Sequence, residues 1–391
     1  MKEISQDLRD DAFVQNPYPF YDRARDLGPV LFWKEMGMLA AFDHASVSAL
    51  LRDRRLGRTP PVPRDAPVHL AAFRALELDS LLELEPPRHT RLRGLVLRAF
   101  TSRRINALRP DIFEIAQELL ANLPRNEAFD LIPSYCQPLP VRIIARLLGV
   151  PETMSDQLLV WSRDMVAMYQ TGVTEEIERR AGASAQEFTD FMRGYVDARR
   201  DQPADDLITH LIAAEEDGQK LSTDEMISTC ILLLNAGHEA TVHSLGNATR
   251  VLIEHAITPT EENAAQIGEE VLRLEAPLHV FTRFASETFD IAPDITIKKG
   301  EEIALVLGAA NRDPTVFPQP HQFDPIRSAV KQTSFGGGLH FCVGAPLARA
   351  ELQIGLSMLF ANLQNLQIAK PAKFANTYHF HKHDELWVMS S

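Results

Sequence analysis

The sequence has few cysteines, no long apolar run and fewer basic than acidic residues. Its three cysteines, Cys136, Cys230 and Cys342, lie far apart and form no CxxC pair. This excludes a disulfide framework or a zinc ribbon and favours a reducing compartment. No stretch approaches about eighteen uninterrupted apolar residues, and the first residues carry acids where a signal peptide carries a basic patch. We therefore expect a soluble, cytoplasmic protein without a membrane anchor.

The charge balance argues against nucleic acid as a partner. There are 40 Lys and Arg against 53 Asp and Glu, a formal net charge of -13 at pH 7, and a chain this acidic does not attract a polyanion overall. A length of 391 residues suggests roughly two or three domains. The sequence contains no repeat, low-complexity tract or Gly/Ser linker. We predict that residues 1–391 form a single domain.

Helical periodicity dominates the chain. Strand patterns are confined to about 28–43, where two short strands are predicted around Glu35 to Gly37, and to 279–308, where alternation and a Lys-Gly turn predict a small antiparallel sheet. The fold class is therefore mainly α with a small β-sheet region. The predicted helices cover 44–52, 88–100, 105–122, 138–148, 152–169, 175–200, 204–216, 223–254 and 261–275, and a last helix begins just after Cys342.

A long irregular segment precedes that last helix. Residues 311–341 contain too many prolines and glycines for regular structure, and irregular stretches of this length are usually functional. They lead into FGGGLHFCVGAPLARAE at 335–351, where Cys342 lies between a glycine-rich loop and a helix start. The helix dipole and loop N–H groups favour a thiolate there, and the glycines allow close backbone approach. Cys136 and Cys230 are interpreted as buried small hydrophobic residues.

This segment resembles the haem-ligand signature of the cytochrome P450 family, F-x-x-G-x-H-x-C-x-G, at Phe335, Gly338, His340, Cys342 and Gly344. In that family the cysteine thiolate is the proximal ligand of the haem iron and pushes electron density onto the metal. The resemblance extends over nearly the whole chain. It implies the cytochrome P450 fold, haem b as the cofactor and Cys342 as the iron ligand.

A second family element is the ExxR motif formed by Glu270 and Arg273. Their spacing of three places both side chains on one helix face. Such a pair is a weak signal alone, because an exposed pair contributes only tenths of a kcal/mol. The resemblance implies a structural role, in which the pair joins an arginine of the later segment and holds the cysteine loop. Arg312 and Arg327 are alternatives for that arginine.

The third element is a helix predicted to begin at a capping box, with Ser222 as N-cap and Glu225 at N3. In its middle, Ala236-Gly237-His238-Glu239 places small residues and an acid inside an apolar run, which is costly unless a ligand lies there. This stretch resembles the oxygen-binding groove of the family, A-G-x-[D/E]-T-T.

The groove departs from the family pattern at Ala240, where the family has a threonine beside the oxygen site. Thr241 follows, but a step of about 100° per residue turns it away from the face of Ala240. We hypothesise that Glu239 relays protons, with Thr241, ordered water or a substrate hydroxyl completing the relay. The alternative for Glu239 is an acid that faces a cavity without a role. His238 and His243 are interpreted as packing or solvent-facing residues.

Haem carries two propionates, which need cationic or donor partners when partly buried. The resemblance assigns this role to His89 and Arg93, which match H-x-x-x-R, and to Arg283 and His340. Phe335 and Gly344 complete the predicted cofactor positions. Taken singly, a histidine or arginine such as these four propionate candidates is more often a surface residue.

Seven arginines and no acid occur between Pro86 and Pro110, in a chain that is acidic elsewhere. In the P450 fold this region borders the cysteine-ligand face. We expect its spare arginines to steer an acidic ferredoxin toward the haem edge; a solvated basic helix is the alternative. The candidates are Arg91, Arg98, Arg103 and Arg104.

The resemblance therefore implies a haem-thiolate monooxygenase that inserts one oxygen atom of dioxygen into a nonpolar small molecule. Electrons would come from NAD(P)H through ferredoxin reductase and ferredoxin. Two alternatives remain: a P450-fold peroxygenase or isomerase without external electrons, and a non-catalytic haem-binding scaffold. Small and aliphatic residues predicted to line the pocket indicate a nonpolar substrate. They are Leu233, Ala236, Ala240, Leu278 and Val280.

Overall fold

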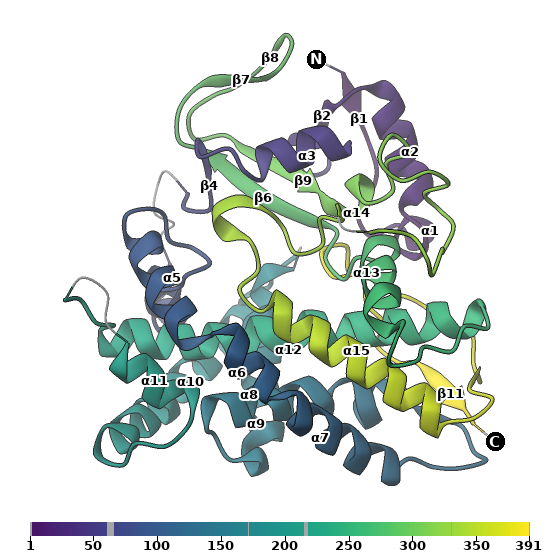
Figure 1. Cartoon of the computed structure of the whole chain (residues 1–391). Helices are drawn as coiled ribbons and strands as arrows, with labels where there is room; N and C mark the ends of the chain where they lie inside the picture. Colours follow the sequence, from purple (N-terminus) through teal and green to yellow (C-terminus); the bar gives the residue numbers. More distant parts are fainter. Residues whose placement is uncertain (1, 61–65, 171, 215–217, 330, 391) are drawn as a thin grey trace.

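The computed structural model describes residues 2–60, 66–170, 172–214, 218–329 and 331–390. A β-rich part that contains the N-terminus lies at the top of Figure 1, and a larger helical part lies beneath it. The mainly α fold with a small β region is thus confirmed. The end of the predicted helix 204–216 lies outside the described residues.

The main sheet has six strands in the order β1-β2-β3-β9-β6-β4. The predicted pair of short strands around Glu35 to Gly37 is the antiparallel hairpin β2-β3, and Gly37 has a φ of +66° in its turn. The sheet is mixed, because β3 pairs parallel with β9, whereas β6 and β9 pair antiparallel as predicted. The strands are β1 Glu3–Ile4, β2 Val30–Trp33, β3 Met38–Ala41, β4 Leu56–Gly57, β6 Val280–Ala285 and β9 Glu302–Val306.

Two smaller sheets complete the β structure. The predicted Lys-Gly turn leads into β9, and the residues before it form the antiparallel hairpin of β7 and β8. A second sheet joins β5 to the C-terminal strands. It was not predicted, because each of its strands has only two or three residues and shows no alternation. The bounds are β5 Phe129–Asp130, β7 Phe289–Ala292, β8 Ile295–Ile297, β10 Gln367–Ile368 and β11 Trp387–Met389.

The predicted helices form with shifted ends and one break. The single helix predicted over 105–122 is two helices that meet at Leu108, because Pro110 occupies the first turn of the second one. The helices are α1 Asp11–Gln15, α2 Tyr18–Leu27, α3 His44–Leu50, α4 Ala71–Leu78, α5 Arg88–Ala99, α6 Ser102–Ala107, α7 Arg109–Ala121, α8 Pro138–Leu148, α9 Ser155–Val166, α10 Glu175–Asp201, α11 Leu207–Ala213, α12 Thr223–Glu254, α13 Ala264–Leu274, α14 Leu307–Ala310 and α15 Ala345–Asn362.

The longest helix, α12, crosses the molecule behind α15 (Figure 1) and packs against α8, α10 and α15. Its start is the predicted capping box: the Glu225 N–H donates to Ser222 Oγ at 3.1 Å, and the Ser222 N–H donates to Glu225 Oε2 at 3.0 Å. No helix in the described part of the chain is long and apolar enough to cross a membrane.

Candidate functional site

The cysteine loop is held in place by backbone contacts. The Cys342 N–H donates to the Phe335 carbonyl oxygen at 3.0 Å, which closes the loop just before α15 begins at Ala345. Gly338 has a φ of +66°, and a Cβ there would lie 2.4 Å from the Leu51 carbonyl oxygen. Only glycine fits a positive φ with so close a backbone neighbour. Close backbone approach therefore requires glycine at position 338, as the sequence predicts.

The sulfur of Cys342 accepts hydrogen bonds from the backbone N–H groups of Gly344 and Ala345 at the start of α15. Burial nevertheless raises the pKa of the Cys342 thiol above its ordinary value, and these N–H groups, together with the charges of Arg93 and Arg349, offset only part of that rise. The predicted helix-end stabilisation is present but does not by itself yield a thiolate. A coordinated metal ion deprotonates a thiol outright, so this environment suits a metal ligand.

One face of α12 is accessible although most of the helix is buried, and the space that this face borders is called the hollow below. Ala236 is exposed and Leu233, Gly237 and Ala240 are half-buried, although the helix runs through the interior. These positions follow a spacing of three and four residues, so they lie on a single face. A small-residue face that opens to an internal space is what a flat ligand between α12 and the cysteine loop requires.

The other predicted pocket residues differ in exposure. Leu278 is half-buried. Val280 is 4% exposed and belongs to a hydrophobic cluster with Ala304 and Val306, so its side chain is part of the β-sheet core. The assignment of Leu233, Ala236, Leu278 and Val280 to a substrate pocket stays a prediction.

His89 and His340 lie side by side, with ring centroids 4.6 Å apart. Both ring nitrogens of His89 are buried and form no hydrogen bond with any described residue. Burial, together with the charges of His340 and Arg93, lowers the pKa of His89 to about 4. His340 Nε2 lies 3.3 Å from Glu85 Oε1, a contact that the sequence did not predict. Two unpartnered imidazole nitrogens in a buried position indicate a polar ligand.

Neither of the two predicted arginines, Arg93 and Arg283, forms an ion pair with a residue in the described part of the chain. Arg93 donates to the Phe341 carbonyl oxygen at 2.7 Å, and its charge is close enough to Cys342 for the two groups to shift each other's pKa. Arg283 is 3% exposed and donates to the Thr282 carbonyl oxygen at 2.8 Å. Burial lowers the pKa of Arg283 to about 10. A buried arginine satisfied by a carbonyl oxygen has donors left for an anion.

These residues fit the haem that the resemblance implies. Cys342 offers a sulfur, α12 offers an accessible face with small residues, and His89 offers two unused ring nitrogens for an acidic group. Arg93 and Arg283 add positive charge in buried or half-buried positions. The donor set therefore suits a flat, acidic, iron-containing group.

The ExxR pair is completely buried and centres on Glu270. Arg273 donates to both carboxylate oxygens at 2.7 Å, and Arg327 Nε donates to Oε1 at 3.1 Å. Arg273 also donates to carbonyl oxygens of the irregular segment after α14. Of the two arginines that the sequence left open, Arg327 is therefore the third member. Arg312 instead donates to the Leu274 carbonyl oxygen and to Glu275.

Glu239 lies between two histidines for which the sequence predicts a packing or solvent-facing role. His238 Nε2 and His243 Nε2 are each 3.4 Å from one of its carboxylate oxygens. Thr241 is buried and donates to the Gly237 carbonyl oxygen at 3.2 Å, so it points away from the hollow as predicted. The i,i+4 spacing of Glu239 and His243 was the available signal for this contact.

The predicted steering arginines divide into two groups. Arg91 forms an ion pair with Glu225 and is therefore not a spare charge. Arg103 is exposed and Arg104 half-buried at the start of α6, and neither forms an ion pair with any residue that the structure describes. Arg98 is exposed near the end of α5.

A family model, curated relatives and solved structures all relate this chain to the same group of proteins. Residues 265–378 match the family model for Cytochrome P450. The chain is 35% identical over 380 residues to 6-deoxyerythronolide B hydroxylase of Saccharopolyspora erythraea, covering 93% of this chain and 92% of that one. It is 33% identical to the biotin biosynthesis cytochrome P450 of Bacillus subtilis, covering 94% of each. The solved structure of P450BioI with a hexadec-9Z-enoic acid-ligated acyl carrier protein has a TM-score of 0.92 at 30% identity, covering 97% of this chain and 99% of that one.

Proposed function

The chain belongs to the cytochrome P450 family, and we propose that it inserts one oxygen atom of dioxygen into a nonpolar small organic molecule at a haem held by Cys342. Its relatives are named as hydroxylases and monooxygenases, so the chain is an oxidoreductase of this type. The observation that carries the proposal is the Cys342 sulfur, which accepts hydrogen bonds from two N–H groups at the start of α15.

Each proposed site residue has a physical task. When bound, haem supplies the redox chemistry with dioxygen. The N–H groups of Gly344 and Ala345 stabilise negative charge on the Cys342 sulfur. His89, Arg93, Arg283 and His340 would hold the propionates through charge-assisted hydrogen bonds. The apolar face of α12 excludes water, and Glu239 is the polar group of that face that can move a proton.

The proposal is tested by turnover with defined electron donors. A spectral-shift screen of nonpolar compounds would include hexadec-9Z-enoic acid, which is named for the P450BioI complex. With NADPH, ferredoxin reductase and ferredoxin, we expect product in proportion to NADPH consumed. Product from hydrogen peroxide alone, without gain from NADPH, would favour a peroxygenase. A haem protein that consumes no NADPH with any compound would favour the scaffold alternative.

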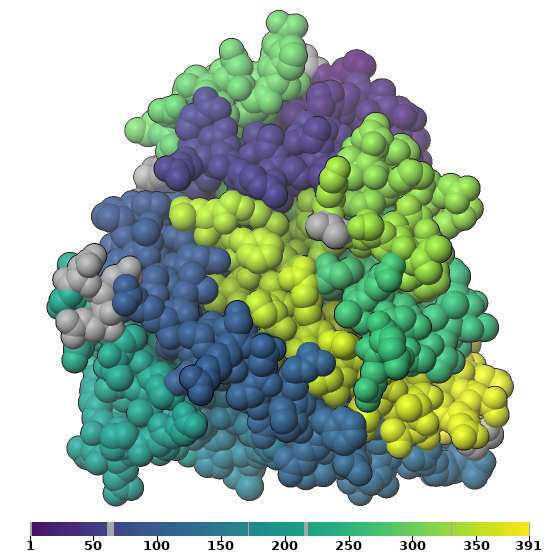
Figure 2. Space-filling model, in the orientation of Figure 1, coloured from purple at the N-terminus to yellow at the C-terminus, as the bar shows by residue number. Residues whose placement is uncertain are grey.

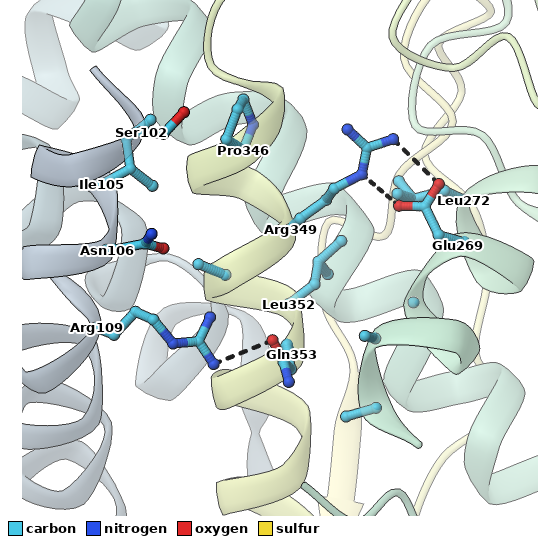
Figure 3. Close-up of a pocket in the computed structure, with 14 residues that line it drawn as sticks. Ser102, Ile105, Asn106, Arg109, Glu269, Leu272, Pro346, Arg349, Leu352 and Gln353 are labelled. Carbon is cyan, nitrogen blue, oxygen red and sulfur yellow. Dashed lines mark hydrogen bonds and ion pairs between the residues drawn. The ribbon is translucent and has the colours of Figure 1, made fainter. Parts of the chain in front are cut away.

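We propose that the electron donor is an acidic ferredoxin that docks beside the cysteine loop. Figure 2 shows the start of α15 at the surface, between the segment of α5 and α6 and the segment of α13. A groove of about 450 Å³ runs along α15 between α6 and α13, as Figure 3 shows. In this groove Arg109 binds Gln353, and Arg349 is paired with Glu269. Arg349 is neutralised by this pair, but the partner of Arg109 is uncharged, so the positive charge of Arg109 beside a recessed surface supports an acidic partner.

Salt should weaken this docking. We expect the rate of reduction by an acidic ferredoxin to fall roughly tenfold or more as salt rises toward about 1 M, because screening removes the attraction of exposed charges. Arg103→Glu should slow reduction at low salt and flatten its salt dependence. Stopped-flow reduction measures both effects.

The matched control is Lys299→Glu, an equal charge reversal at an exposed lysine after β8 and outside this surface. It should leave the rate nearly unchanged. Equal effects of the two reversals would indicate that only net charge matters, and a rate insensitive to salt would rule out steering.

A further inference from the structure

The carboxylate of Glu239 lies between the imidazole rings of two histidines of its own helix. His238 Nε2 lies 3.4 Å from Oε2 and His243 Nε2 lies 3.4 Å from Oε1. The side chains of His238 and His243 are 2% and 4% exposed, whereas that of Glu239 is 19% exposed. The carboxylate thus reaches accessible space, while both histidines lie behind it in the protein.

The two histidines are held differently. His238 Nδ1 lies 2.8 Å from the Leu234 carbonyl oxygen, which can only accept, so this nitrogen carries a hydrogen. Its other nitrogen, Nε2, lies 3.4 Å from Glu239 Oε2. His238 is therefore anchored to the backbone of α12 through Nδ1 while its other edge faces the carboxylate.

His243 Nε2 is buried, and its contact with Glu239 Oε1 at 3.4 Å is long, so it has no closer hydrogen-bond partner among the described residues. Its ring packs edge-on against Phe380 at 5.5 Å. Burial lowers the pKa of His243 below the ordinary histidine value, and Glu239 opposes this shift, while Lys382 and His238 add to it. Glu239 and His238 of α12 and Lys382 of the C-terminal segment are the titratable groups that act on it. His243 is thus the member of the group whose ring can gain and lose a proton.

The nearby hydroxyl groups are already committed to the helix backbone. Ser244 Oγ donates to the Ala240 carbonyl oxygen at 2.8 Å, and Thr241 Oγ1 donates to that of Gly237 at 3.2 Å. Ala240 has no hydroxyl. Neither neighbouring alcohol is therefore oriented to replace the one that the family places at position 240.

The Glu239 carboxyl group holds a proton only weakly. Burial would raise the pKa of Glu239, but hydrogen bonds and charge from His238 and His243 outweigh burial and hold the pKa well below its usual range. The group is thus a carboxylate at neutral pH, and a proton that it delivers must be replaced from a neighbour.

We propose that His243 is that neighbour: its Nε2–H passes a proton to Glu239 Oε1, and the ring regains one from the side of the C-terminal segment, which contributes Phe380 and Lys382. His238 keeps Oε2 in place during the transfer. The inference rests on the proposed monooxygenase function, because that reaction consumes protons at the face of α12. His243 acts through Glu239 and is a positioning residue.

The same helix face continues the polar path one turn further. Asn247, at i+4 from His243, donates to the His381 carbonyl oxygen at 2.9 Å, and its buried Oδ1 has no hydrogen-bond partner among the described residues. His381 in turn contacts Glu275 at 3.0 Å. Polar side chains thus line α12 from the hollow toward the C-terminal segment, where an all-apolar core would be expected.

The first experiment measures the contact without turnover. Histidine ¹⁵N NMR of the ferrous carbon monoxide complex, which is diamagnetic, gives the pKa of the His243 ring in the wild type and in Glu239→Gln. Removal of the negative charge should lower the pKa of His243 further, because the carboxylate favours the protonated ring. A pKa of His243 that does not change in Glu239→Gln would overturn the inference.

The second experiment follows turnover with hexadec-9Z-enoic acid, NADPH, reductase and ferredoxin. His243→Asn should slow NADPH consumption roughly tenfold or more and raise the ratio of rates in H₂O and D₂O, without changing the ligand-induced spectral shift. The wild-type rate should fall as pH rises through the pKa of His243, because the protonated ring becomes scarce, and the variant should lose this pH dependence. Adding Ala240→Thr to His243→Asn should restore much of the rate, since it supplies a hydroxyl.

The outcomes separate the two proposals. If the wild type turns over and His243→Asn keeps its rate, isotope ratio and pH profile, the relay is wrong and the monooxygenase function stands. If the wild type fails with every compound of the screen while the NMR response is present, the function is wrong and the His243–Glu239 pair stands. A slower His243→Asn with an unaltered isotope ratio and pH profile would indicate a merely structural role and would also overturn the relay.

Discussion

Replacing Cys342 with serine is expected to abolish the thiolate-type spectrum of the ferrous carbon monoxide complex and to reduce turnover to background. The substitution keeps the size of the side chain but exchanges a soft sulfur for an alcohol that is a far weaker iron ligand. The N–H groups of Gly344 and Ala345 would then face a neutral oxygen. Absorbance spectra, NADPH consumption and circular dichroism report ligation, activity and folding separately.

The chain offers two matched controls for this change. Cys136 and Cys230 are fully buried, and burial raises the pKa of both thiols, so each is an inert packing residue. Cys230→Ala should keep the thiolate-type spectrum. If Cys342→Ser also kept that spectrum, or if Cys230→Ala lost it in a folded protein, the assignment of the ligand would be wrong.

The second large effect is expected from Arg273→Leu. Arg273 and Glu270 have no exposed side-chain surface, and removal of the arginine leaves a buried carboxylate with Arg327 as its remaining ion-pair partner among the described residues. Carbonyl oxygens of Asn311 and Pro320 also lose their donor. Breaking a buried pair in this way costs about 3–5 kcal/mol. Guanidinium unfolding of the haem-loaded protein measures the loss.

Two further variants test whether the buried charge network causes the loss of stability in Arg273→Leu. Arg179→Leu removes an exposed i,i+4 partner of Glu175 and should leave the free energy of unfolding nearly unchanged, because solvent screens this pair. Adding Glu270→Leu to Arg273→Leu removes the stranded charge and should recover part of the stability. A single variant Arg273→Leu within about 1 kcal/mol of the wild type would contradict the role of this network.

Local features of the fold could be predicted from the sequence, whereas long-range pairings could not. The capping box at Ser222 and the start of α15 after Cys342 form where predicted, because they depend on residues a few positions apart. The parallel pairing of β3 with β9 joins segments far apart in the chain, and nothing in either strand specifies its partner. Pro110 was visible in the sequence, but the helical pattern on both sides concealed the break that it introduces.

At the candidate site the sequence by itself determined the local loop and predicted which of its atoms carry the chemistry. The spacing of Phe335, Gly338, His340 and Cys342 specifies the cysteine loop, because a short loop is built from adjacent residues. Only the tertiary structure decided which partner each charge receives. It gave Glu270 the guanidinium of Arg327 rather than Arg312, paired Arg91 with Glu225, and placed His243 behind Glu239. The physical reason is that burial and distance set the strength of an electrostatic contact, and both arise only when distant segments pack together.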